Sequence, residues 1–296
     1  MRAHLLRTAV LGCVCLLLAG CGGSDESADE PDPTSSSTST APEPSVQMVD
    51  VGGYNLEIAC QGEGSPTVVF EAGSGSDRHA VADWVDLHGA TRVCAYDRAG
   101  IGLSDRRPPT GSTTLGDLAD ELSRLLEGAG IDEPVVLASH SLGGAIDQFF
   151  ADRYPERVAG LVFIDSVVIP GYVKRFGAEH DDGTGGTIDM SQTAKEWKQL
   201  GTFGSIPVFV LTQGFQGDDA GVPQEFRRYF RRMHDELADR SSDSIHVIAK
   251  ESGHMIHETV PDLVAAAITE VLEAVRSGEE LAPCDDRFAE RGGTCG

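Results

Sequence analysis

A serine lies at the point where a short apolar segment gives way to a pair of glycines. Ser141 follows the run 134–138, which reads Pro-Val-Val-Leu-Ala, and precedes the sequence Leu-Gly-Gly. This pattern predicts a strand, a sharp turn and a helix, the context in which a serine Oγ is exposed for attack. A serine hydroxyl is a weak nucleophile, so the same chemistry needs a base beside it. Ser141 is therefore the candidate nucleophile.

The turn departs at one position from the usual Gly-x-Ser-x-Gly pattern. Ser139 stands in the place of the first glycine, so a hydroxymethyl group must fit where the strand and the helix pass closely. The competing interpretation is a βα turn rich in Ser and Gly that has no chemistry. We favour the nucleophile because both flanking patterns, strand and helix, are in place.

Short apolar runs recur along the chain and predict strands that are buried on both faces of a parallel sheet. A Gly-Gly turn at 52–53 predicts an antiparallel hairpin over residues 47–60. Because strands alternate with helical patterns, we expect an α/β fold with a mostly parallel central sheet of about eight strands, flanked by helices. The further strands are expected at 67–71, 92–96, 134–138, 158–164, 207–211 and 245–249.

Helix signals support the same architecture. Thr114 is a predicted N-cap for a helix that ends near Gly128, and Pro261 opens another helix with apolar residues at helical spacing. A third helix is expected over 224–240. We interpret its basic cluster as a solvated face that offsets acidic surface, rather than as a binding patch. The cluster consists of Arg227, Arg228, Arg231 and Arg232.

Four motifs occur in a fixed order: Gly73-Ser74 after the strand 67–71, Asp-Arg-x-Gly-x-Gly-x-Ser at 97–104, Ser-His-Ser-Leu-Gly-Gly at 139–144 and Ser-Gly-His at 252–254. In this order they resemble the α/β-hydrolase family of serine hydrolases, over roughly residues 48–276. The resemblance implies that fold, with an esterase- or lipase-like activity.

The resemblance also implies roles for single residues. His254 lies on the loop after the last strand, where the family places its base, and His257 is the fallback. The backbone N–H groups of Leu142 and Ser74 are the implied oxyanion donors. Asp97-Arg98 is expected to hold the turn after its strand, and His140 is expected to pack into the sheet.

The third member of the triad, an acid that orients the histidine, has two candidates. Most relatives supply it after the seventh strand, where Asp218 and Asp219 come slightly late in this chain. Some relatives place it at the end of the sixth strand, where Asp165 follows the apolar run Leu-Val-Phe-Ile. A buried carboxylate without a partner is costly, so we expect Asp165 to be the acid and keep Asp218 as the alternative.

An insertion, residues 166–206, separates the sixth and seventh predicted strands, where relatives carry their cap. It has a loose centre rich in Gly, Asp and Thr and an apolar patch around Trp197, Leu200 and Phe203. We expect a small lid over an open site.

The N-terminus predicts export. Residues 1–20 combine two arginines with a short apolar run and end in Leu-Ala-Gly before Cys21, too short a run to span a membrane. They resemble a bacterial lipoprotein signal peptide, which implies lipidation of Cys21. Residues 21–46 are dominated by Ser, Thr, Asp, Glu and Pro and predict a disordered tether. Residues 47–296 then form one domain, held at the extracytoplasmic face of the cell membrane by the lipid alone.

The net charge indicates which classes of partner are disfavoured, and the cysteine content indicates the compartment in which the protein works. The formal net charge is −24, which argues against nucleic acid or an anionic membrane surface as a partner. Four cysteines follow Cys21, an even number that favours disulfides in an oxidising compartment, and four cysteines allow three pairings. In the resembling fold the second and fourth strands are neighbours, which favours Cys60–Cys94 and leaves Cys284–Cys295.

These patterns predict a serine hydrolase that cleaves carboxylic esters of small or flexible acyl groups through an acyl-enzyme intermediate. They suggest no cofactor and no metal. A peptidase or amidase remains an alternative because the same triad serves amides. A non-catalytic, lipid-anchored binding module is the alternative from another class.

Overall fold

The computed structural model describes residues 44–296 apart from positions 84, 88, 109–110, 170, 172, 174–176 and 182–185. The predicted signal peptide, Cys21 and nearly all of the predicted tether lie outside the described residues. The first strand, β1, begins at Ser45, slightly before the predicted start of the domain at residue 47.

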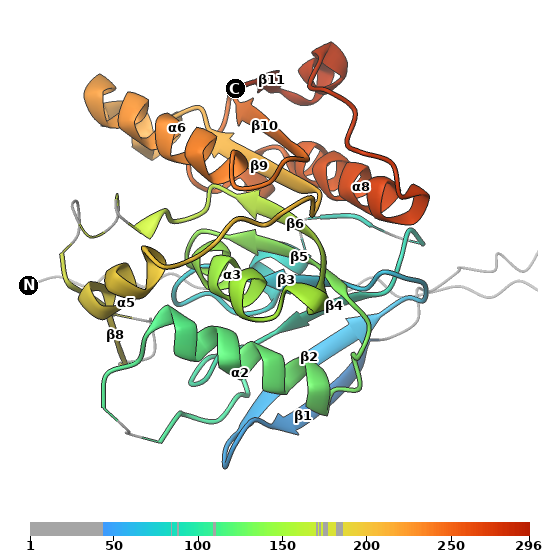
Figure 1. Ribbon diagram of the computed structural model, residues 1–296, viewed down its shortest axis with the longest axis vertical. Helices are drawn as coiled ribbons and strands as arrows, with labels where there is room; N and C mark the ends of the chain where they lie inside the picture. The colour runs from blue at the N-terminus through green and yellow to red at the C-terminus, as the bar shows by residue number, and fades with distance from the viewer. Residues whose placement is uncertain are drawn as a thin grey trace, which may run out of the picture. The chain divides into compact units, whose positions relative to one another are not determined.

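A nine-stranded sheet with the order β1-β2-β4-β3-β5-β6-β9-β10-β11 forms the centre of the domain (Figure 1). The pairs β1/β2, β2/β4 and β10/β11 are antiparallel, and the other neighbours are parallel. The bounds are β1 Ser45–Asp50, β2 Asn55–Gln61, β3 Val68–Glu71, β4 Val93–Tyr96, β5 Val135–His140, β6 Val158–Ile164, β9 Val208–Gln213, β10 Ser244–Ala249 and β11 Gly293–Cys295. The predicted α/β class and mostly parallel sheet are confirmed, and each predicted strand is present within two residues of its expected bounds.

Helices cover both faces of the sheet (Figure 1). Helices α2, α3 and α6 lie on one face, and α1, α7 and α8 lie on the other. Successive side chains of a strand point to opposite faces, so the sheet contributes to a separate hydrophobic core on each side. In β5, for example, Val135 and Leu137 join the first core, and Val136 and Ala138 join the second. The bounds are α1 His79–Ala82, α2 Leu115–Gly128, α3 Leu142–Arg153, α5 Met190–Trp197, α6 Gln224–Ala238, α7 Ile256–Thr259 and α8 Pro261–Ser277.

Local sequence signals explain where these helices begin. The side chain of Thr114 accepts a hydrogen bond from the backbone N–H of Asp117, and Asp117 in turn accepts from the N–H of Thr114, which forms a capping box at the start of α2. Pro261 occupies the first position of α8, and Gly278 ends the helix in a left-handed conformation.

The insertion between β6 and β9 contains a two-stranded antiparallel hairpin, β7 Glu179–Asp181 and β8 Thr187–Asp189, followed by α5. The side chain of Trp197, in its predicted apolar patch, packs against the core formed on the α2 and α3 face.

The C-terminal tail, predicted only as a disulfide-closed loop, adds a short helical turn, η3 Asp286–Arg291, and the ninth strand. The side chain of Phe288 is buried against the core beneath α8. Both predicted disulfides are present: Cys60–Cys94 joins facing residues of β2 and β4, and Cys284–Cys295 ties β11 to the segment before η3. The tail had no apolar run long enough to predict a strand.

Within the part of the chain that the structure describes, no helix is long and apolar enough to cross a membrane.

Candidate active site

Ser141 occupies the sharp turn between β5 and α3. Its backbone has φ 53° and ψ −114°, a conformation that costs a residue other than glycine free energy and that is typical of functional turns. Two backbone hydrogen bonds hold the turn: Ser141 N–H donates to the carbonyl of Ile164 at 3.1 Å, and Val167 N–H donates to the carbonyl of Ser141 at 2.9 Å. A side chain at Gly144 would collide with Ser166, so the close approach of the β6 loop to α3 requires glycine there.

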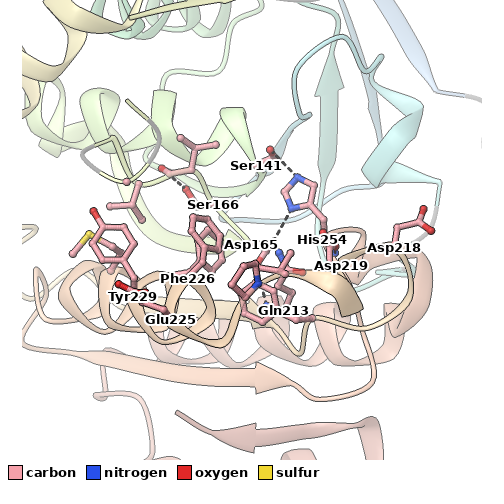
Figure 2. A pocket seen from close by; sticks show the side chains of 18 of the residues that line it. Ser141, Asp165, Ser166, Gln213, Asp218, Asp219, Glu225, Phe226, Tyr229 and His254 are labelled. Atoms are coloured by element: carbon pink, nitrogen blue, oxygen red, sulfur yellow. Dashed lines mark hydrogen bonds and ion pairs between the residues drawn. The ribbon is translucent and has the colours of Figure 1, made fainter. Parts of the chain in front are cut away.

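The structure brings together three predicted residues that lie far apart in the sequence. Ser141 Oγ lies 3.0 Å from Nε2 of His254, and Nδ1 of His254 lies 2.6 Å from Oδ2 of Asp165 (Figure 2). The serine follows β5, the aspartate follows β6, and the histidine follows β10. In a parallel sheet these carboxyl ends meet at one edge, which explains how the three side chains reach one another.

Asp165 is almost fully buried, with 1% of its surface exposed, and its carboxylate is fully engaged. Gln213 donates to it twice: its backbone N–H bonds Oδ1 at 2.8 Å, and its side-chain amide bonds Oδ2 at 2.9 Å. The backbone of Asp165 has φ 46°, a conformation that residues other than glycine rarely adopt. In this conformation its side chain is directed from the end of β6 toward His254. Sequence reasoning did not single out Gln213, because nothing in its local pattern marks it.

The two aspartates after β9 take different positions. Asp218 is exposed and points away from His254 (Figure 2), so in this structure the histidine pairs with Asp165 and not with Asp218. Asp219 Oδ2 instead accepts a hydrogen bond from the backbone N–H of His254 at 2.9 Å. Its role is therefore to fix the loop that carries the histidine.

Opposing effects act on the pKa of His254. Burial disfavours the imidazolium and lowers the pKa, but the hydrogen bond and charge of Asp165, with the charge of Asp219, outweigh burial. The net result is a pKa above the usual 6.5. His254 thus becomes a stronger base than an isolated histidine.

The two neighbouring histidines are buried and neutral. His140 donates from Nε2 to the carbonyl oxygen of His254 at 3.1 Å, and its ring centroid lies 4.5 Å from that of His257. Burial, followed by the charge of His254, lowers the pKa of His257 to about 4 and that of His140 well below its usual range. His140, the last residue of the central strand β5, is buried in the sheet as predicted and also supports the His254 loop.

The loop after β3 lies against Ser141. A Cβ atom at Gly73 would lie 3.0 Å from His140 and 3.4 Å from Ser141. The guanidinium of Arg98 donates to the carbonyl of Ala72 at 2.6 Å and also to the carbonyl of Gly73. In a trans peptide the C=O and the next N–H point in opposite directions, so the N–H of Ser74 points away from Arg98. Arg98 therefore holds the loop, and not merely the turn after its own strand as predicted.

Leu142 is the first residue of α3, so its N–H has no carbonyl partner one turn earlier in the helix. The side chain of Ser74 contacts the insertion: its Oγ lies 2.9 Å from Nε2 of His180 and donates to the carbonyl of Asp181 at 3.2 Å. The hairpin β7–β8 is thus attached to the loop that carries one predicted oxyanion donor.

Beneath the turn lies a buried group of ionisable side chains. Arg98 forms an ion pair with Glu71 at 3.4 Å, and Asp147 of α3 is completely buried next to Ser139. Burial raises the pKa of Glu71 to about 7, although the charge of Arg98 opposes the rise. Burial, then the charge of Glu71, raises the pKa of Asp147 well above its usual 3.8.

A cavity of about 910 Å³ opens beside Ser141 (Figure 2). Its walls come from the loop after β6, the loop after β9 and one face of α6. Of the described residues of the predicted lid, 166–206, those that line this wall lie at its start, from Ser166 to Gly171. The sequence analysis predicted the helix α6 but not its place in the cavity wall, because it considered only the arginines of this helix. The signal was nevertheless present in the spacing of the four apolar residues of α6 that line the cavity: Phe226, Tyr229, Phe230 and Met233.

Two of the arginines of α6 make contacts at the surface of the domain. Arg227 donates to the carbonyls of Ala220 and Val222, and Arg232 lies 3.8 Å from Glu236, one helical turn away. Among the described residues no three His, Cys, Asp or Glu side chains are grouped as a metal site would require.

Comparisons with known proteins support the fold. A family model described as the alpha/beta hydrolase fold matches residues 66–190. The uncharacterized protein YqjL of Bacillus subtilis is 28% identical over 224 residues, which cover 71% of this chain and 85% of the relative. For several other curated relatives the chain spans less than half of the relative's own length.

Solved structures of other proteins superpose on the backbone of this chain. A thermophilic esterase from Thermogutta terrifontis superposes with a TM-score of 0.58 at 21% identity, covering 78% of this chain and 99% of the esterase. Alpha/beta hydrolase domain-containing protein 10 from mouse superposes with a TM-score of 0.59, at the same identity and the same coverage. The chain therefore has the α/β-hydrolase fold.

Proposed function

We propose that this chain is a serine hydrolase that cleaves carboxylic esters through an acyl-enzyme intermediate. The observation that carries the proposal is the continuous chain of contacts from Ser141 Oγ through both nitrogens of His254 to Asp165, at 3.0 and 2.6 Å. A nucleophile, a base and an orienting carboxylate in this arrangement are the elements of acyl transfer.

The first half of the reaction forms the acyl-enzyme. Nε2 of His254 accepts the proton of Ser141 as Oγ attacks the ester carbonyl carbon, and Asp165 stabilises the resulting imidazolium. The oxyanion of the tetrahedral intermediate takes hydrogen bonds from the N–H groups of Leu142 and Ser74. The intermediate collapses when the imidazolium returns its proton to the departing alkoxide, which leaves as the alcohol.

The second half releases the acid. A water molecule gives a proton to His254 and attacks the acyl-enzyme carbonyl, and the same two N–H groups stabilise the second oxyanion. Collapse expels Ser141 Oγ, which recovers its proton from His254, and the carboxylic acid departs. No atom beyond ester and water is consumed.

Two observations favour esters within this class. The cavity beside Ser141 is lined largely by apolar side chains, which suits the acyl group of an ester. The solved structure from Thermogutta terrifontis with the same fold is an esterase.

We also propose that the domain works outside the cytoplasm, anchored at the cell membrane through a lipid on Cys21. Its two disulfides are compatible with an oxidising compartment. Metabolic labelling with an alkyne fatty acid tests the anchor: the wild type should carry label and sediment with membranes, and Cys21→Ala should do neither. Equal labelling of both proteins contradicts it.

An activity-based probe tests the proposed chemistry. A fluorophosphonate should label the purified protein at Ser141, as located by peptide mass spectrometry, and Ser141→Ala should abolish the adduct. Panels of p-nitrophenyl esters and matched anilides then separate an esterase from an amidase. A folded protein that neither reacts with the probe nor turns over either panel is instead a binding module.

A further inference from the structure

The cavity beside Ser141 extends along α6. From Phe226 to Met233 the helix supplies one apolar side chain or more per turn to the wall, and Val167 and Val168 line the cavity from the loop after β6. The two walls approach each other at Gly171, where a Cβ atom would lie 3.2 Å from Cε1 of Tyr229. These residues make a largely apolar channel, with the nucleophile Ser141 in its wall.

The helical rise gives the length of this channel. Met233 lies seven positions after Phe226, which at a rise of 1.5 Å per residue is about 10 Å along the helix. A staggered hydrocarbon chain advances roughly 1.3 Å per carbon for C–C bonds of about 1.5 Å. The wall formed by α6 therefore accommodates roughly eight carbons.

A second cavity, of about 340 Å³, lies beyond the first. Among the described residues, two line both cavities: Val168, which is 6% exposed, and Met233, which is 8% exposed. The second cavity is lined further by the apolar residues Trp197, Leu200 and Leu237. Its polar lining residues include Lys198, Glu236 and Arg240. The side chains of Val168 and Met233 are thus the partition between two spaces.

Charge at the first cavity selects against anions. Asp218, Asp219 and Glu225 all line it, and Asp218 and Glu225 are exposed. A substrate with a carboxylate on its acyl chain would meet like charge there. The cavity suits an uncharged aliphatic chain.

We propose that this cavity binds the acyl chain of neutral, medium-chain aliphatic esters, and that Met233 together with Val168 closes its far end and sets the longest chain accepted. The inference rests on the proposed esterase function for its catalytic meaning. Its structural content, a length-limited apolar site, stands independently of turnover.

Binding of n-alkanols from four to fourteen carbons, measured by calorimetry on the full-length protein, tests the site without requiring catalysis. Affinity should rise about fourfold per methylene, from about 0.8 kcal/mol per buried CH₂, and level off at a length limit. The limit should move to longer chains in Met233→Ala and in Val168→Ala, because either change opens the partition. Met233→Trp should move it to shorter chains.

Leu237→Ala is the matched control. Leu237 is as buried as Met233 but lines only the second cavity, so its truncation should leave the length limit unchanged. Circular dichroism of each variant checks that it is folded, and the two partition variants provide independent tests.

Turnover of p-nitrophenyl esters of the same chain lengths completes the experiment. Length limits that coincide with those of the wild type in both partition variants, or binding without length dependence, overturn the inference. Esters that are cleaved equally well at every length support the proposed function and overturn the inference. A length limit that moves as expected in binding, with no ester cleaved, supports the site and refutes the esterase.

Discussion

Gln213 holds both carboxylate oxygens of Asp165, one through its backbone N–H at 2.8 Å and the other through its side-chain amide at 2.9 Å. The carboxylate is thereby fixed at the end of β6 by the neighbouring strand β9, with Oδ2 directed at His254. A catalytic base is only as well placed as the group that orients it, so Gln213 is a positioning residue for the proposed triad.

Removing the side-chain amide of Gln213 should leave the carboxylate of Asp165 charged but less firmly oriented toward His254. Hydrogen bonds to charged groups contribute about 1.5–3 kcal/mol, so Gln213→Leu should lower kcat/KM for a p-nitrophenyl ester roughly tenfold to a hundredfold. The rate of fluorophosphonate labelling at Ser141 should fall in parallel. Gln199→Leu, an exposed glutamine on the insertion, serves as control; an equal loss there would show that the effect is not specific to the contact.

Substituting Asp165 and Asp218 in turn should show which of the two carboxylates acts as the acid of the triad. Asp165→Asn replaces the carboxylate that stabilises the imidazolium, so kcat/KM should fall by on the order of a thousandfold or more. Asp218→Asn should stay within twofold of the wild type, since this residue is exposed and points away from His254. Steady-state kinetics of both variants decide the question, and the reverse order of effects would place the acid after β9.

The pH profile should report the raised pKa of His254. The base must be neutral to accept a proton, so kcat/KM should rise with pH and reach half its maximum above pH 6.5. Asp219→Asn keeps an acceptor for the His254 N–H but removes a charge that raises this pKa. The acid limb of the Asp219→Asn profile should therefore shift to lower pH, because one of the charges that stabilises the imidazolium is gone.

Glu225→Gln, which removes an exposed carboxylate of the same cavity, is the control for that shift. An acid limb that stays in place in Asp219→Asn, or moves equally in both variants, would falsify the assignment of Asp219 to the histidine.

Asp147 should make stability fall as the pH rises. Its folded-state pKa lies well above its usual 3.8 because burial disfavours the charge. The protonated carboxyl therefore favours the folded state fully below about pH 3.8, and this contribution is lost as the pH rises toward the folded-state pKa. Asp147→Asn removes the titration, so the variant should gain unfolding free energy relative to wild type as the pH rises from 4 to 8.

Urea denaturation at several pH values measures that gain. The exposed Asp132→Asn should show none. A difference between Asp147→Asn and wild type that is the same at pH 4 and pH 8 contradicts the buried-carboxyl interpretation.

The strands, the helix starts at Thr114 and Pro261 and the turn at Ser141 could be predicted from the sequence, because each depends on neighbours within a few residues. Apolar runs identify buried strands, and capping residues and glycines mark where the chain turns. The candidate base His254 also followed from its motif after the last strand. The α/β class could be inferred from the alternation alone.

Only the tertiary structure decided which groups meet. Three contacts depend on which strands are neighbours in the sheet and on the register between them. They are the hydrogen bond of His254 with Asp165, the hydrogen bonds of Gln213 to Asp165, and the hydrogen bond of Arg98 to Gly73. The cavity wall on α6 and the strand β11 depend on how distant segments pack. Local sequence carries no record of such contacts, because they arise when strands far apart in the chain bring their carboxyl ends to one edge.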